Sequence, residues 1–254
     1  METSDDHYNK FHNYYLSYYG QTFQAHRPAD IEELHSYLNK QINFKKGDKV
    51  LDAGCGVCGP AIYFAKKNKI SIDAISNSEK QIETAQELIS KNKFGEQIQL
   101  HLNDYHYIDR MFQSESFDKI LFLESFGHSE NKEDLLTASY NMLKFGGVLY
   151  IKDYFAAEVT GTEQRKLQMK KAVNNLEKYY CYYLADLYDT LKTCRILGFE
   201  IEFIKKPDFK LSNNNVVGAF EKELNIDLFG NEYMPIIVEP LEIKLKKVMK
   251  DKSI

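Results

Sequence analysis

The stretch VLDAGCGVCGPAIYFAKK, Val50 to Lys67, decides the fold of this chain. An apolar run ends at Asp52, three glycines follow within six residues, and Pro60 opens a segment with helical spacing. Glycines at such a turn let the backbone bend tightly and let a ligand lie against bare main chain. Proline is tolerated in the first turn of a helix. The stretch therefore predicts a strand, a ligand-binding loop and a helix in immediate succession.

Short aliphatic runs of strand length alternate with longer segments of helical spacing between Lys49 and Phe155. This alternation is typical of a parallel α/β sheet. We predict strands at Lys49–Ala53, Ser71–Ser76, Gln97–Asn103, Phe117–Leu123, Val148–Asp153 and, after a helix that stops at Gly198, Phe199–Lys205. We predict the intervening helices at Pro60–Lys67, Glu79–Lys93 and Lys132–Leu143.

Three segments fall outside this alternating core. The tyrosine-rich stretch His7–Arg27 is predicted to be helical and to precede a helix at Ile31–Gln41. The polar segment Ala156–Tyr183 is predicted to be a helical insertion after the fifth strand. The tail shows helical patterns at Val216–Leu224 and Leu241–Lys250. No repeat, low-complexity tract or flexible linker divides the sequence, so a single domain is the economical interpretation.

The composition argues against several classes of function. Lysine and arginine number 33 against 37 acidic residues, a formal net charge of −4, so no global cationic field attracts a phosphate backbone. The amino terminus METSDDHYNK lacks an apolar signal core, and no later apolar run approaches the roughly 20 residues of a membrane span. We therefore expect a soluble, cytoplasmic protein with a small-molecule substrate, no nucleic-acid partner and no membrane span. A homo-oligomer is compatible with these data.

Cys55 and Cys58 form a Cys-x-x-Cys pair inside the glycine loop. A redox dithiol and half of a metal site are two interpretations of such a pair. A zinc site needs about four ligands, and the sequence holds no second Cys-x-x-Cys and no His-x-x-x-His cluster. We favour reduced thiols that serve as small side chains in a tight loop, and we predict no metal site.

Asp52 helps to distinguish between the ligands that use a glycine loop. Nicotinamide and flavin enzymes bind pyrophosphate with a similar loop, so the loop alone is weak evidence. A carboxylate two residues before the first glycine suits a ligand ammonium group and poorly suits a pyrophosphate. S-adenosylmethionine carries such an ammonium group and is the cofactor that we expect.

Several ordered motifs resemble those of class I S-adenosylmethionine-dependent methyltransferases, and within them the sterol, tocopherol and prenyl-diphosphate C-methyltransferases, with cyclopropane synthases as relatives. The resemblance covers Tyr8 to Phe155 and rests on DAGCGVCGP, LFLESFGHSEN and LKFGGVLYIKDYF, the last with Phe145 in place of the family's proline. The stretch FHNYYLSYYGQTFQAHRP resembles the family's amino-terminal closing segment, with Gln24 where histidine is common in the sterol enzymes.

The resemblance implies a Rossmann-like, doubly wound α/β fold with a mostly parallel seven-stranded sheet. It implies that the N-terminal and inserted helices form a lid. It divides residues 1–254 of the single domain into an N-terminal helical lid at 1–45, a cofactor-binding core at 46–155, a helical insertion at 156–183, and the rest of the sheet with a helical tail at 184–254.

The resemblance also assigns the cofactor contacts. Many methyltransferases place an acidic residue after the second strand for the ribose, whereas this chain has AISNSEKQIETA, which matches the subfamily and counts against a nicotinamide cofactor. The segment Asn103-Asp104-Tyr105 stands at the adenine position, with an ordinary Asx turn as the alternative. By resemblance, S-adenosylmethionine and its product S-adenosylhomocysteine contact Asp52, Gly54, Cys55, Gly56, Gly59, Ser76, Asn77, Gln81, Asn103, Asp104, Tyr105 and Glu124.

Glu124 and His128 stand at the separation of the family's substrate-facing glutamate and histidine, and with Tyr19 they are the predicted catalytic residues. The alternative is a helix-start carboxylate and a solvent-facing imidazole. If an alkene carbon attacks the methyl group, a carbocation forms, which aromatic faces and a carboxylate stabilise before a base removes a proton. The predicted substrate pocket consists of Tyr15, Tyr18, Phe23, Tyr154, Tyr179 and Tyr183. Helix-face packing is the alternative for most of these rings.

We therefore expect C-methylation of an unsaturated, lipid-like or natural-product molecule of the terpenoid type. N- or O-methylation of a small molecule such as a phosphobase is the nearest alternative, followed by a nicotinamide oxidoreductase and by a non-catalytic cofactor-binding protein. Mg²⁺ is expected only with a diphosphate substrate, because no dedicated carboxylate cluster is identified. Basic residues of the insertion could meet a diphosphate, but a solvated helix face is favoured for them. They are Arg165, Lys166, Lys170, Lys171 and Lys178.

Overall fold

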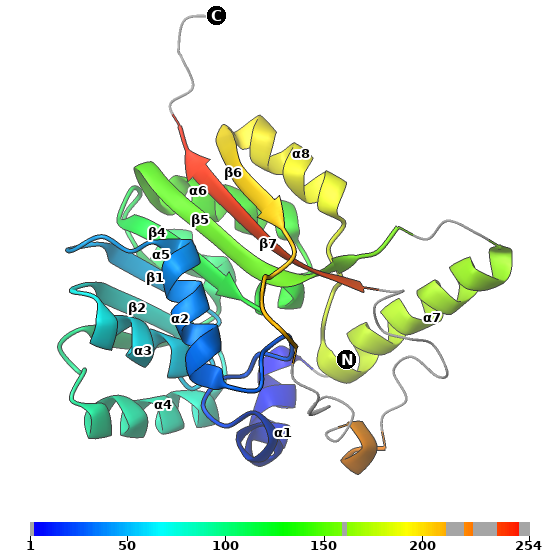
Figure 1. Ribbon diagram of the computed structural model, residues 1–254, viewed down its shortest axis with the longest axis horizontal. Helices are drawn as coiled ribbons and strands as arrows, with labels where there is room; N and C mark the ends of the chain where they lie inside the picture. The colour runs from blue at the N-terminus through cyan, green and yellow to red at the C-terminus, as the bar shows by residue number, and fades with distance from the viewer. Residues whose placement is uncertain (1–2, 159–161, 212–220, 226–237, 249–254) are drawn as a thin grey trace, which may run out of the picture.

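Seven strands form one sheet in this computed structural model, which describes residues 3–158, 162–211, 221–225 and 238–248 (Figure 1). The strands are β1 (Lys49–Ala53), β2 (Ser71–Ser76), β3 (Ile98–Leu102), β4 (Phe117–Leu123), β5 (Leu143–Ala156), β6 (Phe199–Lys205) and β7 (Val238–Lys247). Their order in the sheet is β3-β2-β1-β4-β5-β7-β6. The first five strands pair in parallel, and β7 runs antiparallel to both β5 and β6. The predicted Rossmann-like α/β fold class is confirmed.

Helices cover both faces of the sheet (Figure 1), because alternate side chains of a strand point to opposite faces. Val50 and Leu121 pack in the core formed with α2 (Ile31–Ile42), α3 (Gly59–Lys67) and α4 (Glu79–Asn92). Their neighbours Leu51 and Phe122 pack in the core formed with α5 (Ile108–Met111), α6 (Lys132–Met142) and α8 (Leu187–Leu197). The central strands are therefore buried on both faces, as in a doubly wound fold.

Local sequence signals set the ends of these helices. Asp30, Ser78 and Asn131 cap α2, α4 and α6, because each side-chain oxygen accepts a hydrogen bond from a backbone N–H two or three residues further on. Gly198 ends α8 in the left-handed conformation, at φ +105°. The predicted bounds of α2, α4 and α6 consequently differ from the observed ones by one residue, and the predicted stop of α8 at Gly198 agrees with the structure.

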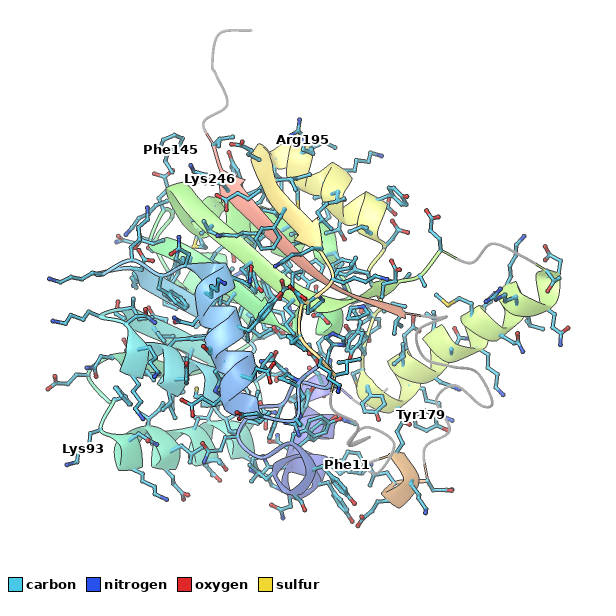
Figure 2. The ribbon with its side chains drawn as sticks, in the orientation of Figure 1. Phe11, Lys93, Phe145, Tyr179, Arg195 and Lys246 are labelled. Atoms are coloured by element: carbon cyan, nitrogen blue, oxygen red, sulfur yellow. The ribbon has the colours of Figure 1, made fainter. Side chains whose placement is uncertain are left out.

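Two further helices, α1 (Ser4–Tyr19) and α7 (Glu163–Tyr180), bring aromatic residues to one end of the molecule. Figure 2 shows Phe11 on α1 and Tyr179 on α7 at that end, away from Phe145 and Lys246. The chain from Gln21 to Arg27 is not helical, so α1 is shorter than the predicted helix. No helix in the described ranges is long and apolar enough to cross a bilayer.

The helix predicted at Leu241–Lys250 is wrong, because this segment contributes to β7. Leu241, Ile243 and Leu245 are buried, so the apolar residues follow the two-residue period of a strand. The segment fills the position between β5 and β6, where both of its edges are hydrogen-bonded. In the other predicted tail helix, residues 221–223 are helical and residues 216–220 lie outside the described residues.

Candidate active site

A pocket lies where β1, β2, β3 and β4 end, at the edge where ligands bind in parallel α/β sheets. It contains about 700 Å³ of space between atoms, part of which is open solvent. All of the predicted cofactor residues except Gly59 line it. The lining residues are Ser4, Tyr8, Phe23, Gln24, Asp52, Gly54, Cys55, Gly56, Pro60, Ser76, Asn77, Gln81, Asn103, Asp104, Tyr105, Leu123, Glu124, Ser125 and His128.

Asp52 is a buried carboxylate at the end of β1, and it is only 2% exposed. In the described part of the chain, no hydrogen bond or ion pair to this carboxylate is present. Burial raises the pKa of Asp52 to about 7. A buried acid without a partner is stabilised in its charged form by a cation. The end of β1 therefore offers a site for a positively charged ligand group.

Two glycines of the loop permit close approaches that a side chain would block. Gly54 has φ +87°, and a Cβ built on it would lie 2.4 Å from Cβ of Ser125. A Cβ on Gly59 would lie 2.0 Å from the backbone oxygen of Gln21. Gly54 therefore lets the glycine loop pack against Ser125, whereas Gly59 lets the N-terminal segment pack on the start of α3.

The side chains that follow β2 connect the pocket to α1. The hydroxyl of Ser76 donates to Oε1 of Gln81 at 2.7 Å, which fixes the orientation of that amide. Nδ2 of Asn77 donates to the hydroxyl of Ser4 at 2.8 Å. The predicted ribose-side residues are therefore together in the structure, and α1 lies over them.

The side chains after β3 are fixed by a helical turn, η1 (Tyr105–Tyr107). Asp104 accepts the backbone N–H of His106 at 2.9 Å, which is the Asx-type cap considered as an alternative. Burial opposes the ionisation of Asp104, but hydrogen bonds from His106 outweigh it and lower its pKa. The hydroxyl of Tyr105 donates to the backbone oxygen of Ser125 at 2.8 Å. Asp104 therefore caps the turn and lines the pocket at the same time, as an ionised carboxylate. The ring of Tyr105 beside it is fixed by its hydrogen bond.

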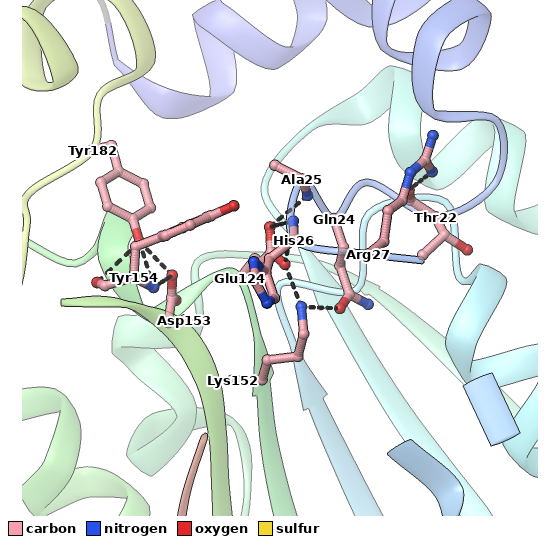
Figure 3. Close-up of polar contacts among 10 residues, drawn as sticks. All are labelled: Thr22, Gln24, Ala25, His26, Arg27, Glu124, Lys152, Asp153, Tyr154 and Tyr182. Atoms are coloured by element: carbon pink, nitrogen blue, oxygen red, sulfur yellow. Dashed lines mark hydrogen bonds and ion pairs between the residues drawn. The ribbon is translucent and has the colours of Figure 1, made fainter. Parts of the chain in front are cut away.

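Glu124 connects the end of β4 to the N-terminal segment (Figure 3). Its carboxylate pairs with Lys152 and accepts the backbone N–H groups of Ala25 at 2.6 Å and His26 at 3.1 Å. Burial raises the pKa of Glu124, while the ammonium of Lys152 opposes this shift. Both carboxylate oxygens are therefore used to hold the segment over the pocket. Lys152 was not predicted, although a charged residue within the apolar run VLYIKDYF was a signal for it.

His128 pairs with Tyr8, a second residue that the sequence did not single out. Nδ1 of His128 lies 3.1 Å from the backbone oxygen of Cys181, and Nε2 lies 2.8 Å from the hydroxyl of Tyr8. Because a carbonyl only accepts, Nδ1 carries the proton and Nε2 accepts from Tyr8. Burial lowers the pKa of His128 to about 4, so the imidazole is neutral near pH 7. The pair places a phenol and a proton acceptor on the pocket wall.

A buried Asp153–Tyr182 pair supports the turn that carries His128, η2 (Phe126–His128). The hydroxyl of Tyr182 donates to Asp153 (Figure 3). The backbone N–H of Gly127 donates to the same carboxylate at 3.1 Å. A Cβ on Gly127 would lie 2.0 Å from the ring of Tyr182. Close packing of this ring therefore fixes the turn.

Aromatic rings of α1 and the following segment pack together beside the pocket. The ring of Tyr15 lies 5.0 Å from that of Tyr8, 5.7 Å from that of Tyr19 and 5.4 Å from that of Phe23. Burial raises the pKa of Tyr15, so its hydroxyl stays neutral. We call Tyr8, Tyr15, Tyr19 and Phe23 the aromatic cluster. Tyr8 and Phe23 reach the pocket itself, whereas Tyr15 and the predicted catalytic Tyr19 lie behind them.

The other predicted substrate residues are not gathered at the pocket. Tyr18 donates its hydroxyl to Glu223, and the ring of Tyr154 contacts that of His26. Tyr179 packs with other rings of the α7 region, and Tyr183 lines a separate groove between α6 and α8. These four tyrosines therefore do not line the pocket.

Neither the cysteine pair nor the basic insertion forms a redox or metal site in the described residues, although Cys55 lines the pocket. Cys55 and Cys58 are buried free thiols, and hydrogen bonding to Cys58 together with burial raises the pKa of Cys55. Among the residues that the structure describes, no group of three or more histidine, cysteine or acidic side chains is arranged to hold a metal ion. The five basic residues of the insertion are exposed on α7.

Comparison with known proteins adds evidence about the family. A family model described as "Methyltransferase domain" matches residues 44–215. The sterol 24-C-methyltransferase of Debaryomyces hansenii is 30% identical over 186 residues, which cover 72% of this chain and 47% of that protein. The chain spans about half the length of the curated relatives it matches.

Solved structures share the fold at low sequence identity. The (4+2)-cyclase SpnF superposes with a TM-score of 0.76 at 16% identity and covers 98% of both chains. Phosphoethanolamine N-methyltransferase 2 of Haemonchus contortus, solved with S-adenosyl-L-methionine, gives a TM-score of 0.75 at 19% identity, over 98% of this chain and 61% of that one. At these identities the likeness establishes the fold alone.

Proposed function

The chain belongs to the methyltransferase-domain family, and from that premise we propose that it transfers a methyl group from S-adenosylmethionine to a small molecule. The observation that carries the proposal is the buried, unpartnered carboxylate of Asp52 beside a glycine loop in the described pocket. The ammonium group of the methyl donor would supply the missing cation. A pyrophosphate would instead place a second negative charge against this carboxylate.

We assign the residues of the pocket to successive parts of the donor. Asp52 would hold the ammonium group, and Gly54, which lines the pocket beside it, would present its bare backbone to the chain that follows that group. Ser76 and Gln81 would hydrogen-bond the ribose, and Asp104 would accept the adenine amino group. When bound, S-adenosylmethionine supplies a methyl group on a positively charged sulfur.

The chain's own residues would orient the acceptor and handle its proton. Tyr8 lines the pocket with His128 behind it, so a proton released at the acceptor can pass to this pair. Glu124 has both oxygens engaged by Lys152 and by backbone N–H groups, so we assign it the closing of the N-terminal segment. We propose Tyr8 and His128, rather than Glu124, as the groups that accept the proton. Closure of that segment would exclude water from the reacting atoms.

We favour a carbon acceptor in an unsaturated lipid-like or terpenoid molecule. Attack by an alkene carbon leaves a carbocation, and the rings of Tyr8 and Phe23, the two members of the aromatic cluster that reach the pocket, would stabilise it. The similarity to a sterol 24-C-methyltransferase supports this class of acceptor. No Mg²⁺ is needed unless the acceptor carries a diphosphate.

A second candidate, N- or O-methylation of a small molecule such as a phosphobase, is favoured by the Tyr8–His128 pair. A heteroatom acceptor loses a proton as it is methylated, and this pair would accept that proton. Both candidates use the same donor site and differ only in the atom that receives the methyl group.

Methylation with a donor labelled by a trideuterated methyl group tests the proposal. We expect a product of mass increased by one labelled methyl group when the protein is incubated with a panel of sterols, prenyl compounds and small amines. Carbon NMR then distinguishes a new carbon–carbon bond from a methylated nitrogen or oxygen. Folded protein that binds no donor and labels no member of the panel would argue against methyl transfer.

A further inference from the structure

Gln24 presents a buried hydrogen-bond donor that has no acceptor. The residue is 2% exposed and lines the pocket. Its Oε1 accepts a hydrogen bond from the ammonium group of Lys152, with 3.0 Å between Oε1 and Nζ (Figure 3). Its Nε2 is buried without a hydrogen-bond partner among the described residues. Buried donors are rarely left without an acceptor, so this amide nitrogen indicates a ligand atom.

Lys152 fixes which end of the amide is available. A lysine ammonium only donates hydrogen bonds, so the amide cannot rotate by half a turn without placing its NH₂ group against a cation. Lys152 is itself held by Glu124, on the opposite side from Gln24 (Figure 3). The nitrogen of Gln24 is therefore left for the pocket, and Lys152 is a positioning residue for it.

The charges around Gln24 permit a negative ligand group. Glu124 would repel an anion by itself, but the ammonium of Lys152 balances its charge, and its oxygens accept backbone N–H groups of Ala25 and His26. The donor faces the same pocket as the unpartnered carboxylate of Asp52. The Nε2 of Gln24 can donate to a carboxylate, and the carboxylate of Asp52 can bind an ammonium group. Both groups lack a partner among the described residues, so together they are complementary to an α-amino-acid group.

We propose that Gln24, oriented by Lys152, hydrogen-bonds the carboxylate of the amino-acid end of the methyl donor while Asp52 binds its ammonium group. This inference rests on the proposed function, because it assumes that the donor occupies this pocket. In this proposal Gln24 is a specificity-determining residue, because it strengthens the binding of ligands that carry an amino-acid group and not of the corresponding nucleosides that lack one.

Calorimetric titration with two ligands tests the proposal. S-adenosylhomocysteine carries the amino-acid group, and 5′-methylthioadenosine lacks it. In Gln24→Met, which preserves length and removes the donor, we expect about tenfold weaker binding of S-adenosylhomocysteine, the order of one hydrogen bond to a charged group. Binding of 5′-methylthioadenosine should be unchanged. Gln24→Glu should weaken S-adenosylhomocysteine further, because a carboxylate would face the ligand carboxylate.

Gln21→Met is the matched control, because Gln21 lies in the same segment and is exposed. It should bind both ligands as the wild type does. Unchanged binding of S-adenosylhomocysteine by Gln24→Met would overturn the proposal, and so would an equal loss for both ligands, which indicates a structural role. A wild-type protein that binds neither ligand would overturn the proposed function as well, so the two failures are distinguishable.

Discussion

Buried polar side chains around the pocket determine what it can bind, and Asp52 is the most informative of them. In Asp52→Asn we expect S-adenosylhomocysteine to bind at least about thirtyfold more weakly, because the ligand ammonium loses its buried counter-charge. 5′-Methylthioadenosine, which has no ammonium, should bind as before. Calorimetric titration measures both affinities. Asp109→Asn is the control, because Asp109 is an exposed residue. Equal losses for the two ligands would contradict an ammonium site at Asp52.

The same residue predicts how the stability of the free protein depends on pH. Asp52 has a pKa of about 7 in the folded protein and about 3.9 in an unfolded chain, so between these values the folded state holds a proton that the unfolded state releases. The contribution of Asp52 to the free energy of unfolding therefore falls as the pH rises from about 4 to about 7. Asp52→Asn should melt at a higher temperature than the wild type at pH 8, and the difference should shrink at pH 5. Scanning calorimetry at the two pH values checks this, and a difference independent of pH would contradict it.

The Tyr8–His128 pair predicts a separation between binding and turnover. Tyr8→Phe keeps the ring and removes the hydroxyl that His128 accepts. We expect kcat for an identified acceptor to fall by about a hundredfold or more, the typical contribution of a general base, with affinity for S-adenosylhomocysteine unchanged. Steady-state kinetics and calorimetry measure the two quantities. Full turnover in this variant would exclude Tyr8 as the proton acceptor.

Among the secondary-structure elements, those whose signals are local were predictable from the sequence. The predicted bounds of β1, β2, β4 and β6 agree with the structure. The first three are short segments rich in apolar residues, and β6 begins after Gly198 and alternates apolar with charged residues at its start. The segment of β7 was misassigned, because Leu241 and Leu245 also fit a helical spacing and the gap between β5 and β6 was not visible in the sequence. The hydrogen-bonded pairing of β7 with β5 and β6 therefore decided between the helical and the strand period of this segment.

The same distinction applies to the site. The loop that contains Asp52 is local and was predicted, together with the turns after β2 and β3. The Lys152–Glu124 and Tyr8–His128 pairs join residues 28 and 120 positions apart, and no local pattern reports such contacts. Glu124 and His128 were therefore predicted as site residues without the partners that define their chemistry.

The N-terminal segment packs closely on the start of α3, so adding one methyl group at Gly59 should destabilise the protein. In Gly59→Ala the new Cβ would lie 2.0 Å from the backbone oxygen of Gln21, so the segment that Glu124 holds must shift. We expect a loss of about 1–3 kcal/mol in the free energy of unfolding and weaker binding of S-adenosylhomocysteine. Gly95→Ala is the matched control, since no atom lies within 4 Å of a Cβ built there. Chemical denaturation measures both variants, and equal stability of the two would show that the close packing at Gly59 is not required.

At the scale of the whole molecule, the sheet, the glycine loop and the N-terminal segment converge on one pocket. Strand order places the ends of β1, β2, β3 and β4 side by side, so residues distant in sequence line one cavity. α1 and the segment after it lie over this cavity through contacts with Asn77 and Glu124. We therefore propose that this architecture binds an elongated, zwitterionic nucleoside.

Calorimetric titration of the folded wild-type protein with S-adenosylhomocysteine, and in parallel with NAD, tests this claim most directly. We predict saturable binding of S-adenosylhomocysteine at one site per chain, and no binding of NAD, whose pyrophosphate would meet the carboxylate of Asp52. Saturable binding of NAD without any heat from S-adenosylhomocysteine would contradict the account.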